Sequence, residues 1–177
     1  MVGKLFRGAM LLLAVTFATA GAARADNTNE GGVEFAFAGS GSSDKDFDGT
    51  QLSFDGSVGV FLNPMVEIGL RQSATYATSN NADDFWSATT RGFLDLQFNL
   101  GRFAPFVGAN IGYVYGDVND TFAAAPEAGV KLYLGDSADT FIFGRVEYQF
   151  FFDDAEEADD SFDDGQFIYS IGVGVRL

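Results

Sequence analysis

The sequence predicts an all-β fold, in which eight antiparallel strands form an up-and-down barrel. The chain of 177 residues contains 22 glycines and 20 phenylalanines but only three prolines. Aromatic residues suit the pleated surface of a strand, whereas proline interrupts it. Eight segments alternate apolar and polar side chains with a period of two, which is the signal of strands that have two different faces.

The first four segments each place apolar side chains at every second position, so that these side chains share one face of a strand. Asn63-Pro64 ends the second segment with a turn signal, and Gly101 follows the fourth. The apolar positions are Val33, Phe35 and Phe37 in residues 33–39; Leu52, Phe54, Val58, Val60 and Leu62 in residues 51–62; Val66, Ile68 and Leu70 in residues 65–76; and Leu94, Leu96, Phe98 and Leu100 in residues 86–100.

The last four segments repeat this pattern. In the sixth segment, EAGVKLYLGD, opposite charges alternate with an oily face, and Gly135-Asp136 ends it. The apolar positions are Val107, Ala109, Ile111, Tyr113 and Tyr115 in residues 103–115; Ala128, Val130, Leu132 and Leu134 in residues 127–136; Ile142, Val146, Tyr148 and Phe150 in residues 140–152; and Phe167, Tyr169, Ile171, Val173, Val175 and Leu177 in residues 167–177.

The connections between the segments alternate in length. Short joins are expected near Asn63-Pro64, Leu100-Gly101-Arg102 and Gly135-Asp136-Ser137, whereas longer acidic loops are expected over Ser40–Gly49, Ala77–Asp84, Gly116–Thr121 and Asp153–Asp164. In a meander, successive connections lie at opposite ends of the sheet. All four longer loops would therefore emerge at one end.

The first residues read as a secretory signal peptide. Lys4 and Arg7 precede an apolar run over residues 9–20, and Ala23-Arg24-Ala25 follows it. We expect cleavage after Ala25, which leaves residues 26–177 as the barrel domain. Because no later segment has about 18 consecutive apolar residues, any membrane residence must come from strands.

The charge of the chain argues against two classes of partner. The formal net charge is −15, and loss of Lys4, Arg7 and Arg24 with the signal peptide makes it −18. Phosphate backbones require a basic surface, so we expect no nucleic-acid partner. The same acidity disfavours electrostatic adhesion to anionic lipid. Cysteine is absent, so stability must come from packing and backbone pairing.

Charge balance predicts which face of the strands is enclosed. In each segment, we call the positions of the apolar side chains the apolar parity and the positions that alternate with them the polar parity. The polar parity carries six acids and five bases, whereas the rest of the mature chain carries 19 acids and two bases, Lys45 and Arg102. An unpaired charge that leaves water costs several kcal/mol, so an enclosed face needs this balance and a solvated face does not. The predicted interior ion-pair network comprises Glu34, Asp55, Glu67, Arg71, Arg91, Asp95, Glu127, Lys131, Arg145, Glu147 and Arg176.

The spacing of these charges suggests how they pair. Glu67 and Arg71, Arg91 and Asp95, Glu127 and Lys131, and Arg145 and Glu147 are all separated by an even number of residues. The two members of each couple therefore share a side of their strand. We expect salt bridges in a narrow barrel, with the apolar parity outside.

Aromatic residues gather toward the segment ends, as in barrels whose aromatic girdles mark the two interfaces of a bilayer. We therefore predict a transmembrane barrel, with aromatic core packing as the alternative. The set near the longer loops is Tyr76, Phe85, Trp86, Tyr113, Tyr115, Phe122, Phe150, Phe151 and Phe152, and the set near the short turns is Phe61, Phe98, Phe103 and Phe141.

With the signal peptide, the eight alternating strands, PFVGANIGYVYGD, GVKLYLG and the terminal YSIGVGVRL, the chain resembles the small eight-stranded outer-membrane barrels of the OmpA transmembrane-domain and OmpX type. The resemblance implies an outer-membrane location, with lipid and lipopolysaccharide as neighbours. Residues 170–177 are similar to the C-terminal signal that the barrel-assembly machinery reads. That signal usually ends in an aromatic residue, whereas this chain ends in Leu177.

Catalysis is not expected. Histidine is absent, which excludes outer-membrane acyltransferases, deacylases, phospholipases and proteases that depend on a histidine base or nucleophile activator. Mechanisms based on Ser–Lys or on carboxylates alone stay open. Glu127 and Glu147 have the chemistry for acid–base work, but each has a basic residue of matching parity nearby, which favours structural ion pairing. We expect no cofactor.

Two acidic loops are candidate cation sites. Asp44, Asp46 and Asp48 precede Gly49 in DKDFDG, and alternate carboxylates before a glycine suit calcium. The alternative is a solvated acidic loop, because Asp55, at the twelfth position of the pattern, lies too far along the next strand to close it.

The loop DDAEEADDSFDDG holds eight acids between Asp153 and Asp164. It is either a solvated loop tip whose like charges repel one another, or a site that shares divalent cations with lipid phosphates.

These expectations lead to one functional hypothesis and two alternatives. The hypothesis is a non-enzymatic outer-membrane barrel with a plugged interior, periplasmic ends and acidic outer loops, which serves the envelope or binds surface ligands as adhesins and antigens do. The first alternative is a small porin-like channel for hydrophobic solutes. The second is a soluble, exported, lipocalin-like barrel in which the oily parity encloses a ligand.

Overall fold

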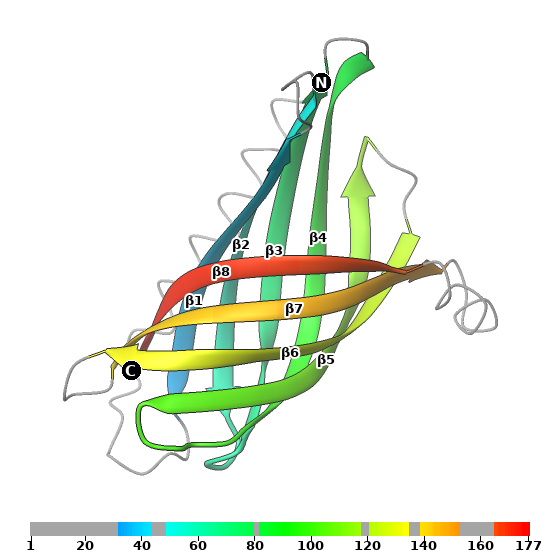
Figure 1. The fold of residues 1–177 in the computed structure, drawn as a ribbon. Helices are drawn as coiled ribbons and strands as arrows, with labels where there is room; N and C mark the ends of the chain where they lie inside the picture. The colour runs from blue at the N-terminus through cyan, green and yellow to red at the C-terminus, as the bar shows by residue number, and fades with distance from the viewer. Residues whose placement is uncertain (1–31, 44–48, 80–81, 118–120, 135–138, 153–164) are drawn as a thin grey trace.

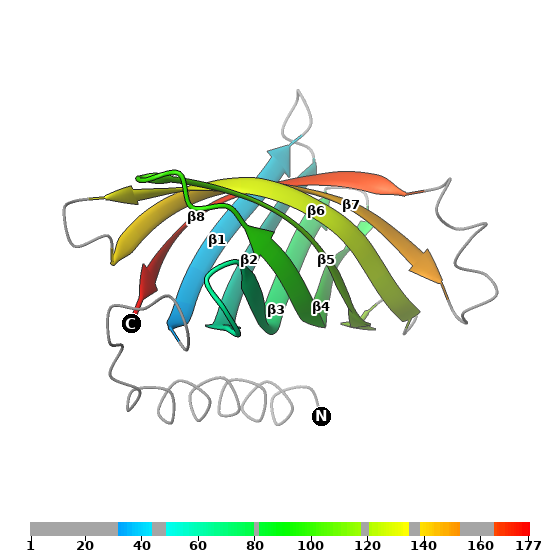
Figure 2. The same ribbon diagram turned by 90° about the horizontal axis from the view of Figure 1, so that it is seen from below.

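Eight strands form one closed antiparallel barrel in the computed structural model, as predicted. The structure describes residues 32–43, 49–79, 82–117, 121–134, 139–152 and 165–177. Each strand pairs with its sequence neighbours, and β1 lies beside β8, which closes the wall (Figure 1 and Figure 2). The strands are β1 (Val33–Ser43), β2 (Gly49–Phe61), β3 (Val66–Ser79), β4 (Ala82–Gln97), β5 (Phe103–Gly116), β6 (Thr121–Leu134), β7 (Thr140–Phe152) and β8 (Gln166–Arg176).

The connections define two ends of the barrel. We call the end at which β2 leads into β3, β4 into β5 and β6 into β7 the turn end, and the opposite end the loop end. Two turn-end connections show the expected turn chemistry. The Asn63 side-chain oxygen accepts hydrogen bonds from the backbone N–H groups of Met65 (2.9 Å) and Val66 (3.0 Å). Gly101 has a φ of 73°, which favours glycine.

The strands extend further toward the loop end than the alternation predicted. β1 continues to Ser43, and β3 and β4 pair as far as Ser79 and Ala82. The described residues of the loops expected over Ser40–Gly49 and Ala77–Asp84 are therefore strand. The sixth strand begins at Thr121, six residues before Glu127. Small and polar residues give weak alternation and therefore conceal a strand, although its backbone pairs normally.

The register staggers the strands around the barrel. A path of paired residues that starts at Ile142 returns to β7 at Phe152, ten residues further along. A stagger of this size in eight strands tilts them by about 40° to the barrel axis. Such a barrel has an interior just wide enough for its own side chains. The intermediate residues of the path are Val173, Phe37, Gly56, Gln72, Thr90, Tyr113 and Phe122.

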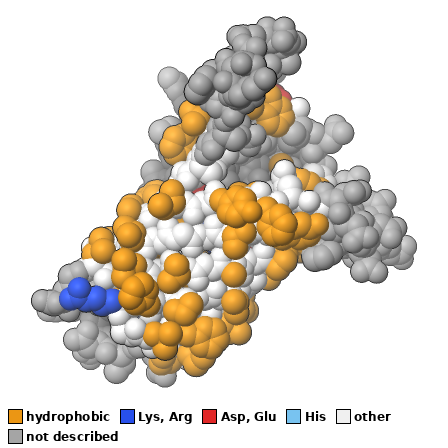
Figure 3. Space-filling view, viewed as in Figure 1, with side chains coloured by type: hydrophobic (Ala, Val, Ile, Leu, Met, Phe, Trp, Pro, Cys, Tyr) orange, Lys and Arg blue, Asp and Glu red, His pale blue; other side chains and the backbone are white. Residues whose placement is uncertain are grey.

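The polar parity faces inward and the apolar parity faces outward. Arg71, Lys131 and Arg145 are between 3% and 6% exposed, whereas Ile111, Val130 and Val173 are between 43% and 56% exposed. Apolar side chains cover the outer face over the strands that face the viewer in Figure 3. The lipocalin-like alternative required the oily parity around the axis, so this alternative is wrong.

Two aromatic residues that we expected in the outer belt lie inside the barrel. Phe61 is 2% exposed and Phe141 is 0% exposed. Both have the parity of the charged interior residues on their strands. The prediction of an outer belt position relied on their place near a strand end and is wrong, whereas their parity indicates the interior. Along the described ranges, no helix is long and apolar enough to cross a membrane.

Candidate functional site

The charged residues of the polar parity meet in the barrel interior. Nine of the eleven are buried, and Asp55 and Arg176 are partly buried. They come from every strand except β5, and all but Asp95 form two groups of ion pairs. The central cluster comprises Asp55, Arg71, Arg91, Glu127, Arg145 and Glu147. The turn-end cluster comprises Glu34, Glu67, Lys131 and Arg176.

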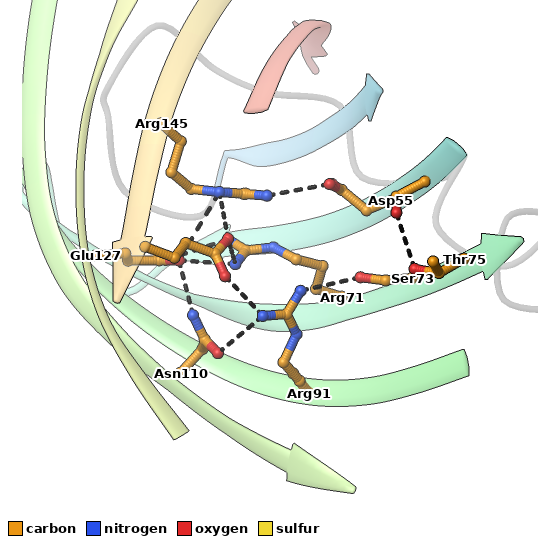
Figure 4. A network of polar contacts seen from close by, with 10 residues as sticks. Asp55, Arg71, Ser73, Thr75, Arg91, Asn110, Glu127 and Arg145 are labelled. Carbon is orange, nitrogen blue, oxygen red and sulfur yellow. Dashed lines mark hydrogen bonds and ion pairs between the residues drawn. The ribbon is translucent and has the colours of Figure 1, made fainter. Parts of the chain in front are cut away.

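Arg71 and Glu127 form the most regular pair of the central cluster (Figure 4). Arg71 Nη1 donates to Glu127 Oε2 over 2.7 Å, and Arg71 Nη2 donates to Glu127 Oε1 over 3.1 Å. Two parallel hydrogen bonds match the planar guanidinium to the carboxylate, which makes the contact both strong and directional. This pair links β3 to β6 across the interior.

Glu147 is the common partner of three guanidinium groups. Its Oε1 accepts from Arg71 Nη1 over 3.1 Å, and its Oε2 accepts from Arg91 Nη1 over 2.6 Å. Arg145 Nε lies 2.6 Å from the same Oε1. Arg145 also donates from Nη2 to Asp55 Oδ2 over 3.1 Å. Because Glu147 is buried, these contacts replace the water that its charge would otherwise require.

Asn110 joins two members of the central cluster from β5, the strand without an interior charge. Its amide nitrogen donates to Glu127 Oε2 over 2.8 Å, and its amide oxygen accepts from Arg91 Nη1 over 3.3 Å. Asn110 is not among the residues that charge balance predicts for the network. Its signal was present, because it is the polar side chain of interior parity between Gly108 and Gly112.

The turn-end cluster is centred on Glu34. Lys131 Nζ donates to Glu34 Oε2 and, over 2.8 Å, to Glu67 Oε2. Arg176 Nε and Nη2 both donate to Glu34 Oε1, over 2.8 Å and 2.5 Å. The Tyr133 hydroxyl donates to the same oxygen over 2.7 Å. The cluster therefore joins β1 to strands on the far side of the barrel and to its neighbour β8.

Aromatic rings surround the turn-end cations. Lys131 Nζ lies 5.7 Å from the ring centroids of Phe61 and Phe106 and 5.2 Å from that of Phe141. The Arg176 guanidinium carbon lies 4.3 Å from the Phe61 centroid. At these distances the negative faces of the rings attract the cations. Because Phe61, Tyr133 and Phe141 are buried, they also exclude water from this end.

Asp95 differs from the other interior acids. It is buried, its Oδ1 makes no hydrogen bond, and no ion pair joins it to a base among the described residues. Its carboxyl group instead hydrogen-bonds that of Glu127. Gly108 provides its space, because a Cβ there would collide with Asp95 Oδ1. With six acids and five bases in the interior, Asp95 is the acid that the ion pairs leave over.

The pairing follows the cross-section of the barrel rather than the spacing along each strand. Of the four evenly spaced couples, Arg145 and Glu147 are in contact. Glu67 pairs with Lys131 instead of Arg71, and Arg91 pairs with Glu147 instead of Asp95. Two residues four apart on a strand are about 13 Å apart along it, which is too far for direct contact, whereas the opposite wall lies within reach.

The interior between the ion pairs contains a small cavity. A cavity of about 20 Å³ lies between the two clusters, lined in part by Glu67, Arg71 and Asp95. This is about the space that a single water molecule needs. Within the described ranges, no group of three acidic, histidine or cysteine side chains is placed to hold a metal ion.

Several predicted features lie outside the described residues. The calcium candidates Asp44, Asp46 and Asp48 are among them, as are the signal peptide over residues 1–25 and the acidic loop over residues 153–164. The C-terminal segment, residues 170–177, is described. It forms most of β8 and pairs with both β1 and β7.

The sequence matches no known family, whereas the fold matches solved structures. No protein-family model matches the chain, and no curated protein matches it. The N-terminal β-barrel domain of Pseudomonas aeruginosa OprF superposes with a TM-score of 0.53 at 18% identity, over 84% of this chain and 98% of that one. Neisserial surface protein A (NspA) superposes with a TM-score of 0.55 at 13% identity, over 82% and 95%. The chain shares the eight-stranded barrel fold of these proteins.

Proposed function

We propose that this chain is a non-enzymatic outer-membrane barrel of a Gram-negative cell, with a plugged interior and a structural or surface-interaction role. The observation that carries the proposal is the inversion of its faces, with ion pairs inside and apolar side chains outside. A closed barrel satisfies all of its backbone hydrogen bonds internally, which is what a hydrocarbon environment requires. The similar folds of OprF and NspA support the same location.

The filled interior supports a role other than transport. The two clusters occupy the lumen at successive levels, and the space between them admits about one water molecule. Aromatic rings close the turn end. The proposed activity therefore resides on the outer wall and at the loop end, where an acidic surface meets the medium, as in adhesins and surface antigens.

The orientation follows from the connections. The first residue of β1, Val33, and the last residue of β8, Arg176, lie at the turn end together with the short connections. Short turns face the periplasm in bacterial barrels. We therefore place the turn end in the periplasm and the loop end outside, with lipopolysaccharide beside it. The barrel-assembly machinery would read β8, which contains most of residues 170–177.

Membrane fractionation followed by heat-modifiable gel migration tests this proposal. The expected result is protein that leaves the membrane only with detergent, and that migrates faster before boiling than after because the closed barrel stays folded. Release by salt or osmotic shock alone, together with the same gel migration before and after boiling, would overturn the proposal.

Planar-bilayer recording separates the plugged barrel from the channel alternative. We expect no large current steps from the reconstituted protein, since in the proposed plugged barrel the interior ion pairs would block an aqueous path. A knockout that loses uptake of hydrophobic compounds, or a stable conductance on the scale of a general porin, would favour the channel instead.

A further inference from the structure

We propose that Asp95 is a proton-binding site in the barrel interior, where its carboxyl group is protonated at neutral pH and donates a hydrogen bond to the Glu127 carboxylate. The charge count is the first observation. The interior holds six acids and five bases, so one proton on an acid makes the opposite charges equal. Among the described interior acids, Asp95 is the one that no ion pair joins to a base.

The hydrogen bond between the two carboxyl groups requires a proton on one of them. The side chains of Asp95 and Glu127 hydrogen-bond each other, and two carboxylates cannot do so, because an ionised carboxyl group only accepts. Glu127 is the acceptor. Arg71 donates to both of its oxygens, and Asn110 donates to Oε2. Donors of this kind favour the charged form of a carboxyl group, so the proton resides on Asp95.

Acids occupy neighbouring inward positions at this level of the wall. Glu67 on β3 is the register partner of Asp95 on β4. Glu127 on β6 is likewise the register partner of Glu147 on β7. Gly108 on β5 lies between the two couples, since it pairs with Asp95 on one side and with Glu127 on the other. Like charges directly opposite each other destabilise a sheet, and a neutral Asp95 removes one charge from the middle of this row.

The surroundings of Asp95 suit a neutral carboxyl group. Asp95 is 4% exposed, and its Oδ1 makes no hydrogen bond. A buried carboxylate without a partner is costly, whereas a neutral carboxyl group leaves only a carbonyl oxygen to satisfy. The cavity of about 20 Å³ beside Asp95 admits about one water molecule. One water is enough for a carbonyl oxygen but does not replace the hydration of a carboxylate.

The cations near Asp95 are engaged by other acids. Arg71, Lys131 and Arg145 line the same cavity, and each of them is ion-paired with at least two acids other than Asp95. From β5, Asp95 faces Gly108, which does not titrate. The ionisable groups that face Asp95 from the other elements are Glu34 on β1, Glu67 and Arg71 on β3, Glu127 and Lys131 on β6, and Arg145 on β7.

Infrared spectroscopy of the mature protein, folded in a maltoside detergent at neutral pH, tests for the proton. The carbonyl stretch of a protonated carboxyl group is separate from the amide and carboxylate bands, and a maltoside contributes no carbonyl group. We expect this band from the wild type. Isotope labelling of the aspartate carboxyl groups should shift it, and labelling of the glutamates should not. Asp95→Asn should abolish the band, whereas Asp117→Asn, the same change at an exposed aspartate, is the matched control and should retain it.

The pH dependence of unfolding gives a second measurement. An aspartate in an unfolded chain is ionised above about pH 5, so folding takes up one proton at Asp95. The unfolding equilibrium constant of the wild type, relative to that of Asp95→Asn, should therefore rise about tenfold per pH unit between about pH 5 and pH 7. Heat-modifiable gel migration of both proteins shows that folded barrels are being compared.

The outcomes separate cleanly. An aspartate-sensitive band that Asp95→Asn abolishes and Asp117→Asn retains supports the site. The site is overturned if the wild type lacks the band, or if the band responds only to the glutamate label, which would put the proton on Glu67 or Glu127. A ratio of equilibrium constants that stays the same over that pH range overturns it too. If Asp95→Asn does not fold, Asp95→Glu takes its place, because it should transfer the band from the aspartate label to the glutamate label.

Discussion

The central and turn-end clusters solve the same physical problem in different ways. In the central cluster, three arginines share Glu127, Glu147 and Asp55 through planar hydrogen bonds. In the turn-end cluster, one lysine and one arginine share Glu34 and are covered by aromatic rings. The central cluster thus relies on donors and acceptors, whereas the turn-end cluster also relies on apolar cover.

This difference teaches where the barrel is most sensitive to loss of a charge. Glu127 and Glu147 in the centre each serve more than one guanidinium. Removal of Glu147 leaves the buried Arg91 without a carboxylate and takes one of the carboxylate partners from Arg71 and from Arg145. At the turn end, Glu34 keeps Arg176 and Tyr133 when Lys131 is changed. A substitution of similar size should therefore cost more in the centre than at the turn end.

Glu147→Gln should have the largest effect. It keeps the shape of the side chain but leaves Arg71, Arg91 and Arg145 without their common carboxylate. We expect the free energy of unfolding to fall by about 3–5 kcal/mol, measured by urea denaturation in lipid vesicles. Adding Arg91→Gln should recover part of this loss, because one unpaired cation is removed. A loss below about 1 kcal/mol would contradict the shared role of Glu147.

Lys131→Met should have a smaller effect. Methionine fills the space between Phe61, Phe106 and Phe141, and Glu34 keeps its other partners, so Glu67 is the acid that loses its cation. We expect a loss of about 2–3 kcal/mol in the same unfolding experiment. Lys131→Arg serves as the charge-preserving control. A cost equal to that of Glu147→Gln would show that the aromatic cover does not buffer the turn end.

Asn110→Ala should cost about 1–2 kcal/mol, because Glu127 and Arg91 each lose a hydrogen bond but keep an ion pair. The expected change is intermediate, and it tests whether β5 stabilises the central cluster without a charge. Replacement of Asn110 by aspartate should be worse than alanine if Glu127 is its neighbour, since two carboxylates would then meet. The same denaturation midpoint measures both variants.

Asp95→Asn should have the smallest effect, with the opposite sign. Asp95 has no ion-pair partner among the described residues, so asparagine removes an unpaired acid, keeps the side-chain volume and still offers a hydrogen-bond donor to Glu127. We expect the barrel to become more stable by about 1 kcal/mol or to stay unchanged. A clear loss of stability would mean that the carboxyl group of Asp95 stabilises the central cluster through Glu127.

Much of the fold could be predicted because strand alternation is a local property. Arg71, Lys131 and Arg145 point inward because their parity opposes that of Leu70, Val130 and Val146, and no knowledge of neighbouring strands is needed. The same rule would have placed Phe61 and Phe141 inside, had parity been applied to them. Strand ends were harder to predict, because Ser, Thr and Ala near the loop end fit either face and hide the alternation.

The sequence by itself determined the eight strands, the face that each side chain occupies and the near balance of charge in the interior. The tertiary structure alone decided which acid meets which base. Arg71 and Glu127 are 56 residues apart, and Lys131 and Glu34 are 97 apart. Such partners meet only when the registers of all eight pairings add up to one stagger around the barrel, and no short stretch of sequence contains that sum.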